Sequence, residues 1–334
     1  MKVKQTIKEF YNNQAEKFSQ TRTKIWPEFN YVAQEVERLL AFKDKIKILE
    51  LGCGDGRLYR FLAEKFPGKI DYVGVDISEW LIQIAKSVES EKLKLESNAS
   101  QVNSEKWIVK NNFEWWRNNR ERWNSYAEFI SASDAGDDKS LQTSWNSSDL
   151  LLSIEGNDFR NLNQDNLWLS SIDNSPAFIV SDMLEYLENV EPETFDFVVA
   201  VASFQHIPTR WERLLILKHI YRILNYGGET MMFNWSFSKW FFKKYKWQVL
   251  KSFVLGILSL GTKPINDIMV PWKAENKTFY RYYHIFFLFE LKKLFKQAGF
   301  VIKEACYINK RGEKTISRID SRNSCIIWIK KVTE

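Results

Sequence analysis

The hydrophobic pattern of the chain alternates short apolar runs with amphipathic stretches. The runs are too short for helices and are typical of strands buried in a parallel sheet; they cover residues 46–51, 72–75, 178–182, 195–201 and 229–234. Several of the stretches between them place apolar residues at helical spacing, at residues 58–66, 81–85 and 211–224. The pattern predicts an α/β fold in which helices connect parallel strands.

The two ends of the chain carry further predicted elements. Residues 5–41 have the pattern of two helices with a break at Thr21–Pro27, where the proline suits the first turn of the second helix. Near the other end, helical spacing over 289–295 stops at Gly299, a residue type common just after a helix. Two strands that can pair antiparallel across a basic loop follow, at residues 301–308 and 324–329.

Two segments interrupt this pattern. Residues 90–176 are rich in Asn, Ser and Asp and delay the third strand, so they are predicted to be an insertion with one helix around 111–129. The Trp and Arg residues of 115–123 fit a small satellite core better than a base-stacking surface. Residues 237–262 alternate aromatic and basic positions around an apolar run, 253–260, that is too short to cross a bilayer. They predict a lid-like helical excursion packed on the sheet, with an interfacial helix or a substrate-binding arm as alternatives.

Composition narrows the class of protein. The chain has 334 residues and 45% hydrophobic content, which suffices for a substantial core. Its net charge of +6, from 48 basic and 42 acidic residues, permits a polyanionic partner without requiring one. Cys53, Cys306 and Cys325 lack metal-ligand spacing, so we expect no metal site and a reducing compartment. The first residues, MKVKQTIKEF, lack the apolar core of a signal peptide, and a cytoplasmic protein without a membrane partner is expected.

The candidate chemistry lies at the ends of the first two predicted strands. The first strand runs into Gly52–Gly56, where residues without Cβ let the backbone press against a ligand. The second ends in Asp76, whose carboxylate can accept both hydroxyls of a ribose. Together they predict a site for an adenosine-containing ligand.

The turn distinguishes between classes of nucleotide site. A dinucleotide site usually has G-x-G-x-x-G, whereas here Gly52, Gly54 and Gly56 alternate behind Glu50. This E-L-G-C-G-D-G string resembles the first motif of the class I S-adenosylmethionine (SAM) dependent methyltransferases. The resemblance implies SAM as the cofactor, with Asp182 accepting a hydrogen bond from the adenine amino group. The implied cofactor-binding residues are Glu50, Gly52, Gly54, Gly56, Asp76, Ile77, Asp182, Met183 and Ala202.

The same resemblance implies the fold and its boundaries. We expect an α/β, Rossmann-like sheet of seven strands with the last strand antiparallel, together with the inserted segment and the lid-like helical excursion. A single methyltransferase domain would cover residues 1–334. N-terminal helices that cover the site would span residues 1–41, and a SAM-binding core in two pieces would span 42–89 and 177–236. The insertion would cover 90–176, a lid or substrate region 237–280, and a C-terminal helix with a strand pair 281–334.

Three further stretches resemble one branch of the family, the enzymes that methylate carboxymethyl-uridine at the tRNA wobble position. They are Phe18–Pro27, Val270–Lys273 and Arg281–His284. Departures from the branch concern the exact substrate more than the reaction class. Gln205 precedes His206 where the branch often has two histidines, Ile25 stands where it tends to carry proline, and the insertion is foreign to it. The resemblance implies tRNA as a partner and, as in eukaryotic relatives, a small zinc-binding activator subunit.

A carboxylate acceptor suits the residue types in these stretches. It is already an anion at neutral pH, so the site must hold it in line in a dry pocket rather than deprotonate it. Arginine can meet a carboxylate through two parallel hydrogen bonds, and Arg22 and Arg281 are the candidates. Tyr283, His284 and His206 are expected to orient the base or ribose.

Two other functions stay open at this point. The first is SAM-dependent O-methylation of a small carboxylic acid or quinone-type metabolite. The second is a SAM-fold protein that binds RNA or a protein partner without catalysis. Weakening of activity by salt would favour tRNA over a small acceptor, because phosphate contacts release counterions.

Overall fold

The structure, a computed structural model, describes residues 2–21, 25–101, 175–259, 264–274 and 277–331. The chain divides into two compact units, residues 1–89 with 169–334 and residues 90–168. The second unit falls almost entirely outside the described residues. The helix expected around 111–129 and the Trp and Arg cluster of 115–123 lie in it, outside the described residues. Arg22 belongs to the first unit but also lies outside the described residues, in the gap at 22–24.

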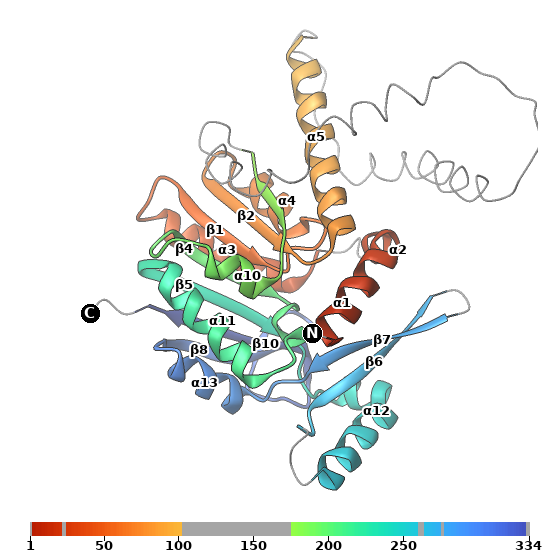
Figure 1. Cartoon of the computed structure of the whole chain (residues 1–334). Helices are drawn as coiled ribbons and strands as arrows, with labels where there is room; N and C mark the ends of the chain where they lie inside the picture. The colour runs from red at the N-terminus through yellow and green to blue at the C-terminus, as the bar shows by residue number, and fades with distance from the viewer. Residues whose placement is uncertain (1, 22–24, 102–174, 260–263, 275–276, 332–334) are drawn as a thin grey trace, which may run out of the picture. The chain divides into compact units, whose positions relative to one another are not determined.

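A mixed sheet forms the centre of the first unit, with the strand order β3-β2-β1-β4-β5-β10-β8-β9 (Figure 1). Five neighbouring strands are parallel, and β10 runs antiparallel to both β5 and β8. The strands are β1 (Ile46–Leu51), β2 (Ile70–Asp76), β3 (Ala177–Val180), β4 (Phe195–Val201), β5 (Leu224–Asn234), β8 (Val301–Asn309), β9 (Lys314–Thr315) and β10 (Ser321–Lys330).

The strand count corrects the sequence prediction, because the described residues form a sheet of eight strands, where seven were expected. The additional strand is β9, two residues that pair with the end of β8. The intervening basic loop closes as a tight turn in which the Asn309 carboxamide accepts the backbone N–H groups of Arg311 and Glu313. Gly312 adopts φ 81° there, a conformation that favours glycine. A turn of this kind carries too few apolar residues to be recognised as part of a sheet from the sequence.

Helices cover both faces of the sheet because alternate residues of each strand point to opposite sides. On β4, Val198 belongs to one core and Phe197 to the other. The first core packs against α10 (Met183–Glu188), α11 (Arg210–Ile223) and α13 (Leu288–Gln297). The second packs against α3 (Pro27–Leu40), α4 (Arg57–Lys65) and the first part of α5 (Glu79–Gln101).

The N-terminal region has one more break than expected. Three helices form it, α1 (Lys2–Asn13), α2 (Ala15–Gln20) and α3. The additional break lies at Gln14, whose φ of −124° is not helical. The prediction that Pro27 begins a helix is confirmed, since it occupies the first turn of α3.

The helix predicted over residues 237–262 is present as α12 (Lys239–Leu258). It is followed by a separate antiparallel hairpin of β6 (Asp267–Ala274) and β7 (Lys277–His284), which was not predicted and is visible in Figure 1. The hairpin residues alternate in burial, as a half-buried strand requires: Ile268 and Val270 are buried, and Met269 between them is exposed. The expected boundary at residue 280 therefore falls inside β7. Within the described part of the chain, no helix has the length and apolar character needed to cross a membrane.

Candidate active site

A cavity opens at the carboxyl ends of the parallel strands. Its floor comes from the tips of β1, β2 and β4 and from the residues after β3, and α1 and α2 contribute Lys4, Tyr11 and Phe18 to its cover. In open α/β sheets this edge is where ligands bind. The wall contains eight of the nine cofactor residues expected from the sequence, which are Glu50, Gly52, Gly54, Asp76, Ile77, Asp182, Met183 and Ala202.

The glycine turn brings backbone against backbone at the tip of β1. The Gly52 and Cys53 amides both donate to the Val75 carbonyl, at 2.7 and 3.0 Å, which fastens the turn to β2. A Cβ on Gly52 would lie 2.3 Å from Ser203 Cβ, and Gly52 has φ +79°. No other residue type fits this position, because both the close approach and the backbone conformation exclude a side chain.

Asp76 is held by two backbone amides. Its Oδ2 accepts from the Gly54 N–H and its Oδ1 from the Ser78 N–H, both at 2.9 Å. Burial raises the pKa of the Asp76 carboxyl to about 6, against the opposing effect of these amides. A Cβ on Gly54 would meet nothing within 4 Å, so the turn faces open space beside the carboxylate.

Glu50 is a buried carboxyl in the cavity wall, with 4% of its surface exposed. The Tyr72 hydroxyl donates to its Oε2. Burial raises the pKa of Glu50 to about 8, although the Tyr72 hydrogen bond and the Arg57 charge act in the opposite direction. Glu50 therefore takes up a proton more readily than an exposed glutamate, and a bound cation would favour its ionised form.

Asp182 joins the end of β3 to the helical cover. It caps α10 by accepting the Leu184 N–H at 3.0 Å and pairs with Lys4 Nζ at 3.1 Å. Lys4 also pairs with Glu212 at 3.0 Å, so one lysine of α1 connects two elements beneath it. Gly56 is the expected cofactor residue that does not line the cavity. It precedes α4 with φ +76°, and a Cβ there would lie 2.9 Å from the Phe178 ring, which makes it a packing position.

The other end of the cavity is aromatic. The rings of His206 and Tyr283 meet edge to face with centroids 4.6 Å apart, and Trp235 lies 4.6 Å from Tyr283. The His206 Nδ1 lies 2.8 Å from the Tyr282 carbonyl, which can only accept, so Nδ1 carries a proton. In the neutral ring Nε2 is then the acceptor of the Tyr11 hydroxyl at 3.1 Å. Sequence reasoning missed Tyr11, because an aromatic residue on an amphipathic helix is an ordinary core signal.

Arg281 lies directly behind this aromatic wall and does not itself line the cavity. Its guanidinium stacks on the rings of Phe10, Trp272 and Tyr283 at 5.0, 4.8 and 5.1 Å. It is hydrogen-bonded to Tyr11, which with Tyr283 lines the cavity. Arg281 is 3% exposed, and its Nε and Nη1 atoms have no hydrogen-bond partner among the described residues. No acidic side chain in the described part of the chain forms an ion pair with it.

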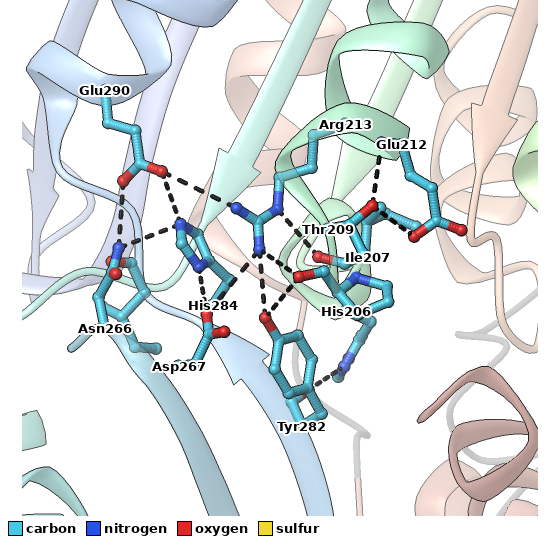
Figure 2. Close-up of polar contacts among 12 residues, drawn as sticks. His206, Ile207, Thr209, Glu212, Arg213, Asn266, Asp267, Tyr282, His284 and Glu290 are labelled. Carbon is cyan, nitrogen blue, oxygen red and sulfur yellow. Dashed lines mark hydrogen bonds and ion pairs between the residues drawn. The ribbon is translucent and has the colours of Figure 1, made fainter. Parts of the chain in front are cut away.

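His284 lies apart from the cavity, in a buried polar cluster shown in Figure 2. Its ring nitrogens contact Asp267 Oδ1 at 2.5 Å and Glu290 Oε1 at 2.7 Å. Successive residues of a strand point to opposite faces, which separates His284 and Tyr282 from Arg281 and Tyr283. The structure thus brings Arg281, Tyr283 and His206 together and leaves His284 on the other face of β7.

Comparison with known proteins adds the family. The family model for the methyltransferase domain matches residues 27–305. No curated protein sequence matches the chain. Among solved structures, a SAM-dependent methyltransferase from Methanosarcina mazei is 17% identical, with 88% of this chain and 95% of that chain covered and a TM-score of 0.50. A methyltransferase from Haloferax volcanii, solved with the Trm112 methyltransferase activator, is 11% identical, with 98% of both chains covered and a TM-score of 0.47.

The likeness to the Methanosarcina structure shows the α/β fold. The family match spans most of the chain and includes the glycine turn, Asp76, Asp182 and His206. The chain therefore belongs to the methyltransferase domain family, with the α/β fold of the SAM-dependent methyltransferases and SAM as its cofactor.

Proposed function

We propose that this protein transfers the methyl group of SAM to a carboxylate, and that the carboxylate belongs to the carboxymethyl group of a modified uridine at the tRNA wobble position. The observation that carries the proposal is the buried Arg281 guanidinium beside the aromatic end of the cavity, with two nitrogens that have no partner among the described residues. The stretches Phe18–Pro27 and Arg281–His284 resemble the wobble-uridine enzymes, and this resemblance indicates that the carboxylate belongs to a tRNA nucleoside.

The residues at the strand tips fit the cofactor. Gly54 leaves the open space next to Asp76 that a ribose requires, and Gly52 lets the turn lie close to Ser203. Glu50, Asp76 and Asp182 are acidic, which suits a ligand that carries a sulfonium and an ammonium group. When bound, SAM supplies a methyl group on sulfur that an anionic oxygen can displace. We propose that these residues hold it, together with Gly52, Gly54, Ile77, Met183 and Ala202.

Arg281 supplies the argument for an anionic acceptor. A buried cation without a counter-charge is costly, and cation–π contacts offset only part of that cost. A carboxylate that reaches Nε and Nη1 would satisfy both nitrogens at once and gain charge-assisted hydrogen bonds. After transfer the ester is neutral, so its attraction to Arg281 falls and product release is favoured.

The aromatic wall supports a planar acceptor. Tyr283, Trp235 and His206 line the cavity with their rings in mutual contact. Unpaired bases bind to proteins by stacking on such side chains. His206 uses Nδ1 on the Tyr282 carbonyl and Nε2 on Tyr11, so we assign it to positioning of the wall rather than to proton transfer. A carboxylate needs no general base, which agrees with this assignment.

Mass spectrometry of tRNA nucleosides tests the tRNA acceptor. Cells that lack the gene should lose a methyl ester nucleoside and accumulate the corresponding acid, and expression of the wild-type chain should restore the ester. An unchanged nucleoside profile would contradict the tRNA acceptor while leaving carboxylate methylation open. A cytoplasmic location belongs to the same proposal.

A small carboxylic acid is the second candidate acceptor, and one observation favours it. Lys4, which lines the cavity, is already paired with Asp182 and Glu212, and Lys8 on the same helix is paired with Glu79 at 2.6 Å. Paired lysines contribute little to phosphate binding. The two acceptors differ in salt response, because KM for tRNA should rise steeply with ionic strength whereas KM for a small acid should change little.

On the resemblance to the wobble-uridine enzymes, we also propose that a small zinc-binding activator subunit binds this protein. Co-purification of the tagged full chain from its own cells tests it. A stoichiometric zinc-containing partner is the expected result. Full activity of the purified chain alone would contradict the need for one.

A further inference from the structure

We propose that α12 docks this protein on an anionic lipid surface. The helix follows β5 and belongs to the excursion that was expected to be a lid. Its surface has two properties that occur together nowhere else in the described part of the chain: a continuous run of exposed apolar side chains, and lysines without any acidic residue. The proposal does not depend on the identity of the methyl acceptor.

The buried side of α12 is narrow and fixes the helix in place. Phe241, Tyr245, Ser252 and Gly256 are its buried residues. The Ser252 hydroxyl donates to the Ile265 and Asp267 carbonyls at 2.9 and 2.7 Å, which holds the helix against the start of β6. Phe241 and Tyr245 belong to a core cluster with Ile268, Val270 and Tyr283. The remaining sides of the helix are therefore presented outward in a defined orientation.

The outward sides are strongly apolar. Trp247 is 68% exposed and Leu258 is 73% exposed. The full set of large exposed apolar residues on the helix is Trp240, Phe242, Trp247, Leu250, Phe253, Val254, Leu255, Ile257 and Leu258. Exposed apolar residues that occur singly are normal, but a contiguous set of this kind marks an interaction surface.

The charges on the same helix have one sign. Lysines stand at 239, 243, 244, 246 and 251, and residues 235–266 contain no aspartate or glutamate. Lys244 Nζ lies 4.7 Å from the centre of the Trp240 ring, and Lys246 Nζ lies 5.5 Å from that of Trp247. Ammonium groups beside exposed tryptophans match the headgroup region of a bilayer, where both side chains are favoured. Each lysine near an anionic surface adds to the attraction.

Lipid fits this surface better than the other candidate occupants. Bases stack on aromatic rings, whereas the second half of the helix exposes aliphatic Val254, Leu255, Ile257 and Leu258. A second copy of α12 would not satisfy the five lysines of the helix, because the helix carries no acidic residue to pair with them. No helix in the described residues has the length and apolar character to span a membrane, and the proposal lays α12 along the lipid surface. The proposal differs from the expectation from the sequence of no membrane partner, and the experiment below decides between them.

Docking would leave the helix itself between the lipid surface and the cavity. The Phe241 and Tyr245 rings, on the buried side of α12, have centroids 5.0 Å apart, and Trp235, which lines the cavity, lies 6.1 Å from Phe241. The lipid would therefore contact the outward sides of α12 and not the cavity.

Flotation of the full chain with lipid vesicles tests the proposal. The probes are vesicles of phosphatidylcholine alone and vesicles with about one third phosphatidylglycerol. We expect the wild-type chain to float with the anionic vesicles, at least about tenfold more than with the neutral ones, and to be released by high salt. No flotation with anionic vesicles would overturn the proposal.

Matched variants locate the surface. Trp247→Ser with Leu258→Ser should lower flotation at least about tenfold. Trp211→Ser with Phe289→Ser, at 67% and 72% exposure on α11 and α13, should leave it unchanged. Likewise, Lys243→Glu, Lys244→Glu and Lys246→Glu together should abolish it, whereas the same change at Lys292, Lys293 and Lys296 of α13 should not. Unchanged circular dichroism and SAM affinity verify that each variant is folded.

The competing occupants give distinguishable results. Light scattering that shows a dimer, converted to a monomer by the α12 apolar variant without any flotation, would assign the helix to self-association and overturn the proposal. Binding of poly(U) that is lost in the α12 lysine variant, again without flotation, would assign it to RNA. Equal flotation of the α12 variants and the wild type would show that another surface binds lipid.

Discussion

The Gly54 backbone N–H donates to the Asp76 carboxylate at 2.9 Å, which joins the tips of the first two strands across the floor of the cavity. The second Asp76 oxygen accepts the Ser78 N–H. The carboxylate is thereby fixed in orientation before any ligand arrives, and each oxygen keeps a lone pair for a hydroxyl. Preorganisation of this kind reduces the entropy cost of ordering side chains on ligand binding.

Replacement of Asp76 tests this arrangement. Asp76→Ala should weaken SAM binding by about 10- to 100-fold, since a charge-assisted hydrogen bond to a ligand contributes about 1.5–3 kcal/mol. Titration calorimetry with SAM measures the change. Asp71→Ala is the matched control on the same strand, because Asp71 pairs with Lys45 away from the cavity. Equal affinities for the two variants would mean that Asp76 does not touch the cofactor.

Substitutions at Gly52 and Gly68 distinguish the cost of a steric clash from the cost of an unfavourable backbone conformation. Both have positive φ, +79° and +71°, but a Cβ would collide with Ser203 only at Gly52 and would meet nothing within 4 Å at Gly68. Gly68→Ala should cost about 1–2 kcal/mol of unfolding free energy from the backbone alone. Gly52→Ala should cost at least about 2 kcal/mol more because the β4 tip must shift. Urea denaturation measures both, and similar costs would refute the close-approach argument.

Local signals made the strand tips predictable. Gly52, Gly54 and Asp76 can be recognised from a few neighbouring residues, because a glycine turn and a strand-terminal carboxylate are local sequence patterns. The acceptor end depends on contacts between distant segments. Tyr11 and His206 are 195 positions apart, and nothing near either residue predicts their hydrogen bond.

The hairpin shows a second limit of the sequence. A helix was predicted over residues 237–262, where α12 lies, but no strand was predicted over the residues that follow. The hairpin becomes recognisable only when Ile268 and Val270 are known to be buried and Met269 exposed. The family resemblance implied that His284 acts with Arg281, but the strand period places them on opposite faces of β7.

The pH dependence of stability should change in Glu50→Gln. A carboxyl with a raised pKa in the folded chain stabilises the fold below its ordinary pKa and loses this contribution as pH rises through the folded value. For Glu50 the window runs from pH 4.5 to about 8. Across it, wild-type stability should fall relative to Glu50→Gln by on the order of a few kcal/mol. The glutamine can still accept the Tyr72 hydrogen bond.

Thermal melts of the ligand-free proteins measure this difference. The melting temperature of Glu50→Gln should exceed that of the wild type increasingly toward pH 8. Asp76, whose pKa is also raised, titrates in both proteins and largely cancels in the comparison. Parallel curves across the whole window would contradict a buried, protonated Glu50.

Tyr11→Phe tests the positioning of His206. The variant removes the hydroxyl that donates to His206 Nε2 and is also hydrogen-bonded to Arg281, and it keeps the ring packing on Phe10 and Phe18. We expect kcat/KM to fall by on the order of tenfold with SAM affinity unchanged. Tyr31→Phe is the control, since its hydroxyl donates to the Gly312 carbonyl, outside the cavity wall. A loss of SAM affinity in Tyr11→Phe would place the tyrosine at the cofactor instead.

Arg281→Met tests the carboxylate acceptor most directly. The substitution keeps an unbranched apolar side chain among Phe10, Trp272 and Tyr283 but removes the charge. Arg222→Met on α11 is the matched control, because Arg222 bonds the Leu187 carbonyl away from the cavity. The acceptor is tRNA from cells that lack the gene, and the readout is transfer of labelled methyl from SAM into alkali-labile ester, with SAM affinity measured in parallel.

The account predicts that Arg281→Met loses about 100-fold in ester formation while SAM affinity stays within a few fold of the wild type and Arg222→Met transfers normally. Normal transfer by Arg281→Met, or a methylated product that resists mild alkali, would contradict a carboxylate held by Arg281.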